Sequence, residues 1–364
     1  MISCYPMSCE PPETLIARHE AFRQCRPVDR PLLGLWLGGY FPADQFPAGV
    51  SRWRPRQVLA PGDVTPATFA PDYERLYRLH CDARDDFFFV GSAYWGIPWL
   101  EAILGCAVTV AQRNCQAQPS LDRPDEVGPV DLDQSPWFQL LLRFTRELIA
   151  LAAGRFPVCP PLLRGPGDCA AAMLGGMSFV TGLLDQPAGM KRLLAHCASV
   201  RSAVIHRLGA MIPDWHGTHA AGGYPSKIWS QLTVAYHQDD SAALLSPALF
   251  HQFLVPLHRQ MCGAAEVNFV HLHSACLWPV DILLEEGVYD IFEINIDHAG
   301  SGPPLAKLLE TFQRIQSAGR PLLLWGRFTR EDWDLVHREL RPAGLSLQPM
   351  VRDPADRQVF EKYR

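Results

Sequence analysis

Eight short apolar runs recur along the chain, and their alternation with longer helical patterns constrains the fold more than any other feature. The runs span residues 31–38, 86–92, 156–163, 231–237, 268–274, 290–297, 320–327 and 345–351. Their length and composition are typical of buried strands, and amphipathic stretches lie between most of them. Strands that alternate with helices form parallel sheets, and eight such units form a closed barrel. We therefore predict an α/β fold with a single (β/α)8 TIM barrel.

Helix start signals between the runs agree with this order. Ser246 and Pro247 begin an amphipathic segment, with the serine as N-cap and the proline at the first helical position. A second helix is expected to begin at Pro187, and a third is capped by Thr329. No glycine-rich phosphate-binding motif follows an early strand, and the glycines of 164–176 are interpreted as a strand-to-helix loop.

The chain has 364 residues, which suits either two ordinary domains or one large single-core fold. Its prolines and glycines do not cluster into a linker, and no shift in composition marks a second domain. We therefore predict an N-terminal extension over residues 1–28 and one barrel domain over residues 29–364.

Charge and hydrophobicity exclude several classes of function. The formal net charge of −5 and the lack of a basic stripe argue against nucleic-acid binding. No run of about 18 apolar residues is present, so no membrane-spanning helix is expected. The N-terminus lacks the pattern of a signal peptide, and the 11 cysteines are scattered without CxxC pairs, which favours reduced thiols. The expected location is cytoplasmic.

Polar side chains share one face of the fifth and sixth predicted strands. In the fifth strand, period-two alternation places His271 and His273 on the same face. In the sixth, Glu293, Asn295 and Asp297 alternate with apolar residues. A barrel strand has helices on one side and the barrel interior on the other, so these polar residues are expected to point inward.

The neighbouring strand ends add more polar and aromatic residues to this region. Asp239 and Asp240 follow the fourth strand, while Trp325 and Arg327 lie at the end of the seventh. Histidines and carboxylates at the mouth of a barrel suit either a metal site or general acid/base chemistry. Because the chain has 13 histidines, a His-x-His motif can also arise by chance, and two hydrogen-bonded core histidines remain a third interpretation.

Several segments resemble the uroporphyrinogen decarboxylase superfamily, which also includes cobalamin-dependent methyltransferases. The resemblance runs from about residue 18 to about residue 333 and rests on the order and spacing of four segments. These segments are GIPWLEAILGC (96–106), RGPGDCAAAMLGG (164–176), DDSAALLSPALFHQFLVPLHRQ (239–260) and DHAGSGPPLAKLLETF (297–312). The resemblance implies a (β/α)8 barrel, in agreement with the count of strands.

The chain departs from the pattern of true uroporphyrinogen decarboxylases. The stretch after the first strand, LGLWLGGYFP (33–42), lacks the arginines that hold substrate carboxylates in that family. FVGSAYWG (89–96) stands where the catalytic aspartate is expected, and the expected tyrosine is missing from 164–174. The cations left for the pocket are mainly Arg164 and Arg327. Decarboxylation of uroporphyrinogen is therefore not expected.

The methyltransferase branch implies a zinc site made of a His-x-Cys motif and a late cysteine. His271 and His273 fall on the His-x-Cys position, and residues 345–358 contain no cysteine. A remaining metal site would comprise His271, His273 and a carboxylate, for which we select Glu293, with Asp239 as the alternative. Such a set of two nitrogens and one oxygen suits zinc or another divalent transition metal.

Our leading hypothesis is a metal-assisted methyltransferase that moves a methyl group or one-carbon fragment, with a corrinoid as the methyl donor implied by the resemblance. Asp239, Asp240 and Asp297 are the expected catalytic acid/base residues. The expected pocket residues are Trp36, Tyr40, Trp95, Arg164, Asn295, Trp325 and Arg327. Expected partners are a small-molecule substrate and a corrinoid protein, and a homodimer is left open. The alternatives are a metal-free decarboxylase or lyase, and a non-catalytic barrel that binds a tetrapyrrole or corrinoid.

Overall fold

The centre of the molecule is a six-stranded parallel sheet. It is seen in a computed structural model that describes residues 11–83, 85–221, 228–297 and 301–351. Consecutive strands along the chain are neighbours in the sheet from β7 to β11, and β1 pairs with β11. In sheet order the strands are β1 (Leu32–Leu33), β11 (Leu345–Pro349), β10 (Leu322–Gly326), β9 (Ile291–Ile296), β8 (Val267–His273) and β7 (Val234–Gln238).

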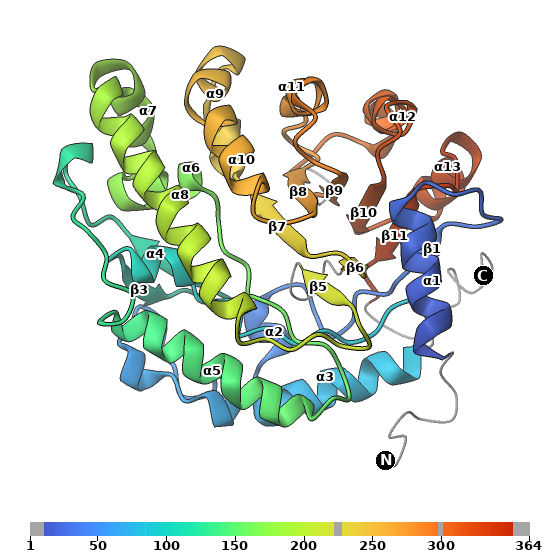
Figure 1. Cartoon of the computed structure of the whole chain (residues 1–364), viewed down its shortest axis with the longest axis horizontal. Helices are drawn as coiled ribbons and strands as arrows, with labels where there is room; N and C mark the ends of the chain where they lie inside the picture. Colours follow the sequence, from blue (N-terminus) through green and yellow to red (C-terminus); the bar gives the residue numbers. More distant parts are fainter. Residues whose placement is uncertain (1–10, 84, 222–227, 298–300, 352–364) are drawn as a thin grey trace.

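Helices surround this sheet. In Figure 1, α9 to α13 form an arc outside the C-terminal strands, α3 and α5 lie on the opposite side of the molecule, and α1 lies near α13. The helices are α1 (Pro12–Arg23), α2 (Pro42–Gln45), α3 (Ala70–Ala83), α4 (Trp99–Ile103), α5 (Pro136–Ala152), α6 (Pro166–Leu174), α7 (Gly176–Asp185), α8 (Pro187–Gly209), α9 (Pro247–Phe253), α10 (Val255–Cys262), α11 (Pro279–Glu286), α12 (Leu309–Ser317) and α13 (Arg330–Glu339).

Two of the eight predicted strands do not form as regular strands. Segments 86–92 and 156–163 share only one isolated parallel bridge, between Gly91 and Val158. Prolines 157, 160 and 161 lack the N–H that a ladder requires, which explains the irregular pairing of the second segment. Single backbone hydrogen bonds, from Asp86 N to Leu33 O (2.8 Å) and from Gly165 N to Gln238 O (2.6 Å), connect this region to β1 and β7. The described residues therefore form a barrel-like α/β fold without a continuous eight-stranded sheet.

The predicted helix starts are confirmed, with one difference. Ser246 caps α9 by accepting a hydrogen bond from Leu249 N, and Thr329 caps α13. The long helix after Gln186 is α8. The segment after Ser246 is divided into α9 and α10, which begins at Val255. Pro256 accounts for the break, because its ring cannot continue a helix from the preceding turn.

The N-terminal segment is joined to the body of the molecule by polar contacts. Asp86 accepts hydrogen bonds from Arg18 (2.8 Å) and Arg30 (2.5 and 2.8 Å) and from the backbone N–H of Leu33. Glu20 on α1 accepts from Ser230 Oγ at 2.8 Å. Helix α1 therefore packs against the sheet region instead of extending away from it.

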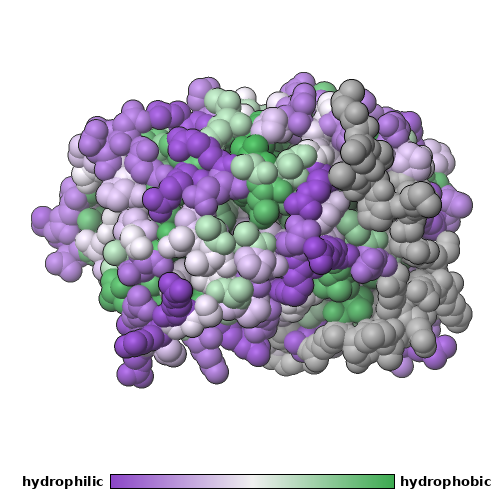
Figure 2. All heavy atoms as spheres, turned by 90° about the horizontal axis from the view of Figure 1, so that it is seen from below, coloured by the Kyte–Doolittle hydropathy of each residue, from purple (hydrophilic) through white to green (hydrophobic). Residues whose placement is uncertain are grey.

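Two small antiparallel sheets were not predicted. One is formed by β2 (Val58–Leu59), β3 (Ala107–Val110) and β4 (Cys115–Gln118), and the other by β5 (His219–Ala221) and β6 (Ile228–Ser230). On the face shown in Figure 2, the described hydrophobic residues form small separate patches among hydrophilic ones. No single helix in the described part of the chain is long and apolar enough to cross a membrane; α6 and α7 meet that test only as a pair bent by 106°.

Candidate active site

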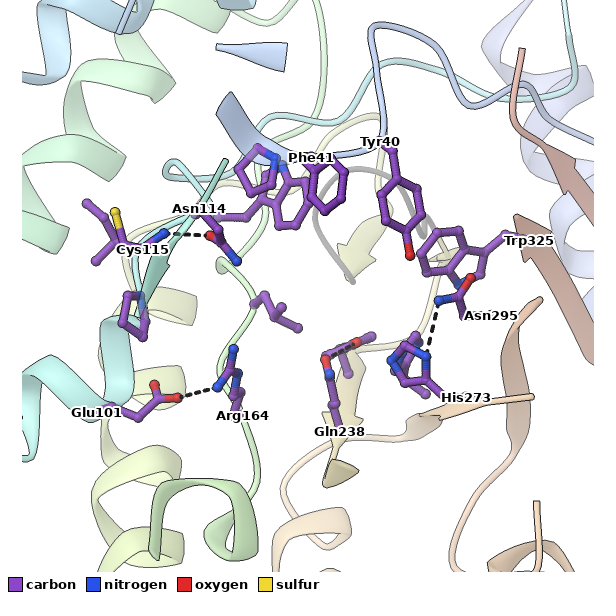
Figure 3. A pocket seen from close by; sticks show the side chains of 18 of the residues that line it. Tyr40, Phe41, Glu101, Asn114, Cys115, Arg164, Gln238, His273, Asn295 and Trp325 are labelled. Carbon is purple, nitrogen blue, oxygen red and sulfur yellow. Dashed lines mark hydrogen bonds and ion pairs between the residues drawn. The ribbon is translucent and has the colours of Figure 1, made fainter. Parts of the chain in front are cut away.

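A pocket of about 280 Å³ opens beside the carboxyl ends of the central strands (Figure 3). One wall comes from the ends of β7 to β10, and the opposite wall comes from the loops before α2, α4 and α6. Its lining includes Trp36, Tyr40, Phe41, Trp95, Glu101, Asn114, Arg164, Tyr236, Gln238, His271, His273, Asn295 and Trp325. The inward orientation predicted for the polar residues of the fifth and sixth strands is thus seen for three of them, His271, His273 and Asn295.

His271 is held in place by a buried carboxylate. In the pairing of β8 with β9, His271 lies opposite Glu293, and its Nδ1 is 2.6 Å from Glu293 Oε1. The same oxygen accepts a hydrogen bond from Trp325 Nε1 at 2.5 Å. Because an ionised carboxylate can only accept, Nδ1 carries the proton and Nε2 is the nitrogen with a free lone pair.

His273 has the same arrangement with a second carboxylate. Its Nδ1 is 2.7 Å from Asp297 Oδ1, and its Nε2 is 3.8 Å from Asp240 Oδ2. Burial alone would lower the pKa of His273, but the hydrogen bond to Asp297 and the charge of Asp240 outweigh it and raise the pKa above its usual value. Burial likewise opposes ionisation of Asp297, yet the hydrogen bond from His273 keeps the pKa of Asp297 below its usual value.

Asp240, His271 and His273 could together hold a metal ion. One ligand atom from each lies within 4.8 Å of the other two. The sequence prediction of Glu293 as the third ligand does not match this geometry. Glu293 contacts His271 Nδ1, on the side of the ring away from Nε2, and orients the ring. Asp240 is the carboxylate of this group: it lies two residues beyond the end of β7, and its Oδ2 is 3.8 Å from His273 Nε2.

Asp239, predicted as an acid/base residue, is directed away from the pocket. Its carboxylate accepts hydrogen bonds from Asp168 N (2.8 Å), Gly167 N (3.3 Å) and Ser241 Oγ (3.0 Å), and it pairs with His258 Nε2 at 3.2 Å. Neither Asp239 nor Asp240 is among the residues that line the pocket, but Asp240 Oδ2 lies 3.8 Å from His273 Nε2, which does line it. Asp239 therefore attaches the start of α6 to the end of β7, and Asp240 is the carboxylate available to the site.

Aromatic side chains form the upper wall of the pocket in Figure 3. The rings of Trp36 and Trp325 have centroids 4.1 Å apart, and Tyr40 stacks on Trp36 at 5.7 Å. Trp95 is fixed by a hydrogen bond from its Nε1 to Gln45 Oε1. The predicted pocket residues Trp36, Tyr40, Trp95 and Trp325 all line the cavity.

The cationic side of the pocket consists of Arg164, which pairs with Glu101 at 3.3 Å. Glu101 is almost fully buried, and neither of its carboxylate oxygens has a hydrogen-bond partner in the described residues. Burial would lower the pKa of Arg164, but the charges of Glu101, Asp168 and Asp240 raise it. Arg327, the other predicted cation, is exposed and does not line the pocket, because the chain leaves the sheet after Gly326.

Comparison with known proteins supports the fold. No protein-family model matches the chain, and no curated protein does either. Among solved structures, a methyltransferase from Methanosarcina mazei is similar with a TM-score of 0.64. The match covers 95% of this chain and 99% of that chain, at 14% sequence identity. The likeness is one of fold.

Sequence reasoning missed several residues of the pocket, among them Tyr236, Gln238 and Glu101. Tyr236 donates a hydrogen bond to Gln238 Oε1 (2.7 Å), and Gln238 Nε2 donates to Asp240 Oδ2 (2.5 Å). Period-two alternation along 234–238 could have placed both side chains on the inner face of the strand. Glu101 lies within a segment used for the family resemblance, but its pairing with Arg164 joins residues far apart in sequence and required the structure.

Proposed function

We propose that this chain is a metal-assisted methyltransferase of the uroporphyrinogen decarboxylase-like superfamily, acting on a small molecule. One observation carries the proposal: each of two adjacent imidazoles has its Nδ1 held by a carboxylate, and the third potential ligand, Asp240, stands beside them. Metal-binding histidines usually have this arrangement, in which a carboxylate fixes the tautomer and orients the ring. The similar fold of a methyltransferase supports the choice of reaction.

The donor set fits a transition metal. His271 and His273 would each offer Nε2, and Asp240 would offer a carboxylate oxygen, which is the kind of set that binds zinc and related divalent ions. A bound metal would act as a Lewis acid that lowers the pKa of an acceptor thiol or hydroxyl group. Glu293 and Asp297 would orient the two imidazoles, while Gln238 would hold Asp240 through its short hydrogen bond.

The opposite side of the pocket indicates the kind of substrate. Arg164 offers its guanidinium to an anionic group, while Trp36, Tyr40, Trp95 and Trp325 offer apolar surface. A small acceptor with an apolar body and one anionic group fits these walls. The cavity of about 280 Å³ is too small for a methyl-donating corrinoid to be enclosed beside the acceptor. In our proposal a corrinoid would therefore approach from the mouth, carried by a partner protein.

The first experiment measures metal content and metal affinity. Protein purified without chelator is analysed for zinc, cobalt, nickel, manganese and iron, together with His271→Ala, His273→Ala and Asp240→Asn. We expect close to one equivalent of metal in the parent protein and a loss of affinity of at least roughly 100-fold in each variant. Less than about a tenth of an equivalent in the parent, with no uptake of added zinc, would refute the metal part.

The second experiment measures methyl transfer. Methylcobalamin is incubated with the zinc-loaded protein and a series of thiols and phenols that do or do not carry a carboxylate, and loss of the methyl–cobalt bond is followed in the visible spectrum. We expect transfer to a carboxylate-bearing acceptor, and none with His273→Ala. His216→Ala is the matched control, because this histidine lies outside the pocket.

A metal-free acid/base reaction is the second candidate. The observation that favours it is His273, which lies between Asp240 and Asp297 and whose pKa is raised by these carboxylates. A histidine in such a position can move a proton near neutral pH. Activity that survives complete chelation but disappears in His273→Ala would support this reaction over metal-assisted transfer.

A further inference from the structure

A second cavity, of about 360 Å³, lies on the other face of β7 from the candidate active site. Tyr236 and Gln238 point to the active-site pocket, whereas Ala235 and His237, which alternate with them, line the second cavity. Its other walls come from the C-terminal half of α8, the end of α10 and the β5 region. Its volume is within the range typical of small-molecule sites, roughly 300–1,000 Å³.

The cavity wall contains a buried guanidinium without a carboxylate partner. Arg201 on α8 is 2% exposed, and its Nε and Nη2 donate to the carbonyl oxygens of Leu163 and Tyr236. Its Nη1 has only the sulfur of Met261, at 3.8 Å. Burial of a cation is costly unless an anion or strong acceptors surround it. Among the described residues, no oxygen atom accepts a hydrogen bond from Arg201 Nη1.

The same wall contains an imidazole nitrogen without a partner. Asn268 Nδ2 donates to the carbonyl oxygens of Cys262 and Ala265, which fixes the orientation of its amide and makes Oδ1 the acceptor. Oδ1 is 3.0 Å from His237 Nε2, so Nε2 carries the proton of this ring. Burial and the charge of Arg201 lower the pKa of His237, so the ring is neutral and its Nδ1 is an acceptor. No described group donates to this nitrogen.

We propose that this second cavity is a binding site for a small carboxylic acid with an apolar body. One carboxyl oxygen accepts a hydrogen bond from Arg201 Nη1. Binding takes up one proton from solvent at His237 Nδ1, and this N–H donates to the other carboxyl oxygen. The apolar body packs on the rest of the lining, to which Ile205, Ile212, Pro213, Trp215, Ala235 and Ala264 contribute. Together with this proton, a carboxylate satisfies both unpartnered groups, and it supplies the negative charge that Arg201 lacks.

The test uses octanoate and 4-phenylbutyrate as probes of an aliphatic and an aromatic acid, and octanamide as the uncharged analogue. Binding is measured by isothermal titration calorimetry and by the rise of the melting temperature. We expect at least one of the acids to bind with a dissociation constant below about 1 mM, and octanamide to bind roughly tenfold more weakly. No binding of either acid, or equal binding of octanamide, would overturn the assignment.

Two variants locate the binding event. Gly209 is an exposed residue of the cavity lining, and an added Cβ there would meet no atom within 4 Å, so Gly209→Leu is expected to fold and to obstruct the opening of the cavity. Gly128 is the matched control, because it also has no neighbour within 4 Å and does not line the cavity. We expect Gly209→Leu to abolish binding and Gly128→Leu to keep it.

Arg201→Met removes the cation, and we expect it to weaken binding of the acids at least roughly tenfold while leaving binding of octanamide unchanged. Unchanged binding of the acids by Gly209→Leu would refute the site.

Discussion

Glu293 has no exposed surface, and its Oε1 is close to both His271 Nδ1 and Trp325 Nε1. We expect Glu293→Gln to lower zinc affinity roughly 10- to 100-fold, because an amide orients the ring of His271 less firmly than a carboxylate does. The measurement is competition of the protein with a chromophoric chelator at fixed pH. Circular dichroism and melting of the metal-free protein show whether the variant still folds.

Asp297→Asn is the corresponding variant for His273, whose Nδ1 contacts Asp297 Oδ1. We expect it to lower zinc affinity as well. If Glu293→Gln and Asp297→Asn both leave the affinity unchanged, the two carboxylates do not support metal ligands. The histidine–carboxylate pairs would then be interpreted as hydrogen-bonded core or as a proton-handling group.

Arg164 and Glu101 form the other residue pair on which the pocket depends. Because Glu101 is 1% exposed, Arg164→Gln would leave a buried carboxylate without its cation. We expect this variant to lower the free energy of unfolding by about 2–4 kcal/mol. The double variant Glu101→Gln with Arg164→Gln should recover more than half of that loss, since no charge then remains buried. Denaturant unfolding measures both, and an additive loss in the double variant would contradict this account of the pair.

At the level of elements, the loop that begins α6 is in close contact with the end of β7. A Cβ on Gly167 would lie 2.3 Å from Ser241 Oγ and 2.6 Å from Asp239 Oδ1. We expect Gly167→Ala to destabilise the protein by about 1–3 kcal/mol, because α6 must move away from the strand end. Gly176→Ala is the control, since its Cβ would meet only Leu244 Cδ1 at 3.9 Å. Equal melting temperatures for the two variants would show that this contact has no importance for stability.

Proline distinguishes the regular pair β8 and β9 from the irregular segment at 156–163. The runs at 268–274 and 290–297 became β8 and β9 with the predicted faces, since each contains an unbroken alternation. The runs at 86–92 and 156–163 were equally apolar, yet they run beside each other with little regular pairing. Hydrophobicity predicted where these segments are buried, but their pairing depends on backbone donors that prolines remove.

The candidate site was predictable as far as it depends on alternation within a strand. His271, His273 and Asn295 line the pocket as expected. Successive side chains of a strand point to opposite faces, so the direction of one side chain fixes the direction of the others. Residues just beyond strand ends were not predictable in this way. Asp239 points to α6, Asp240 is exposed beside His273, and Arg327 lies outside the pocket, because loop geometry after a strand has no fixed period.

Asp86 connects the segment before β1 to the body of the molecule, and its ionisation makes stability depend on pH. Burial would raise the pKa of Asp86, but its hydrogen bonds and ion pairs with Arg30 and Arg18 and the N–H of Leu33 lower the pKa below its usual value. The group therefore stabilises the fold above its unfolded pKa of about 3.9, and this contribution is lost as pH falls through the lower folded pKa.

We expect Asp86→Asn to lower the free energy of unfolding by about 2–4 kcal/mol at neutral pH. The difference between the variant and the parent should shrink as the pH is lowered from about 4, because the parent then loses its own carboxylate charge. Urea unfolding at a series of pH values measures it. A difference that stays constant down to the lowest pH would contradict the assigned charge interaction.

At the level of the whole molecule, residues distant in sequence meet around one sheet. The candidate metal site and Trp325 come from the C-terminal half of the chain, whereas Trp36, Tyr40, Trp95 and Glu101 come from the first third. The two cavities are separated by β7, whose alternating side chains face one or the other. An active site built in this way requires the N-terminal elements to stay attached to the sheet.

The N-terminal helix is the element for which this requirement can be tested. His19 on α1 packs against Phe87 and Trp229, with ring centroids 4.7 and 4.4 Å apart, and Glu20 accepts from Ser230 Oγ. Removal of residues 1–23 would expose these rings and leave polar groups unpaired, so we expect a loss of several kcal/mol and a lower denaturant midpoint. Removal of residues 1–10 keeps every contact named here and is the control. If the longer deletion has the same midpoint as the shorter one, α1 is a dispensable extension and residues 24–364 suffice for the fold.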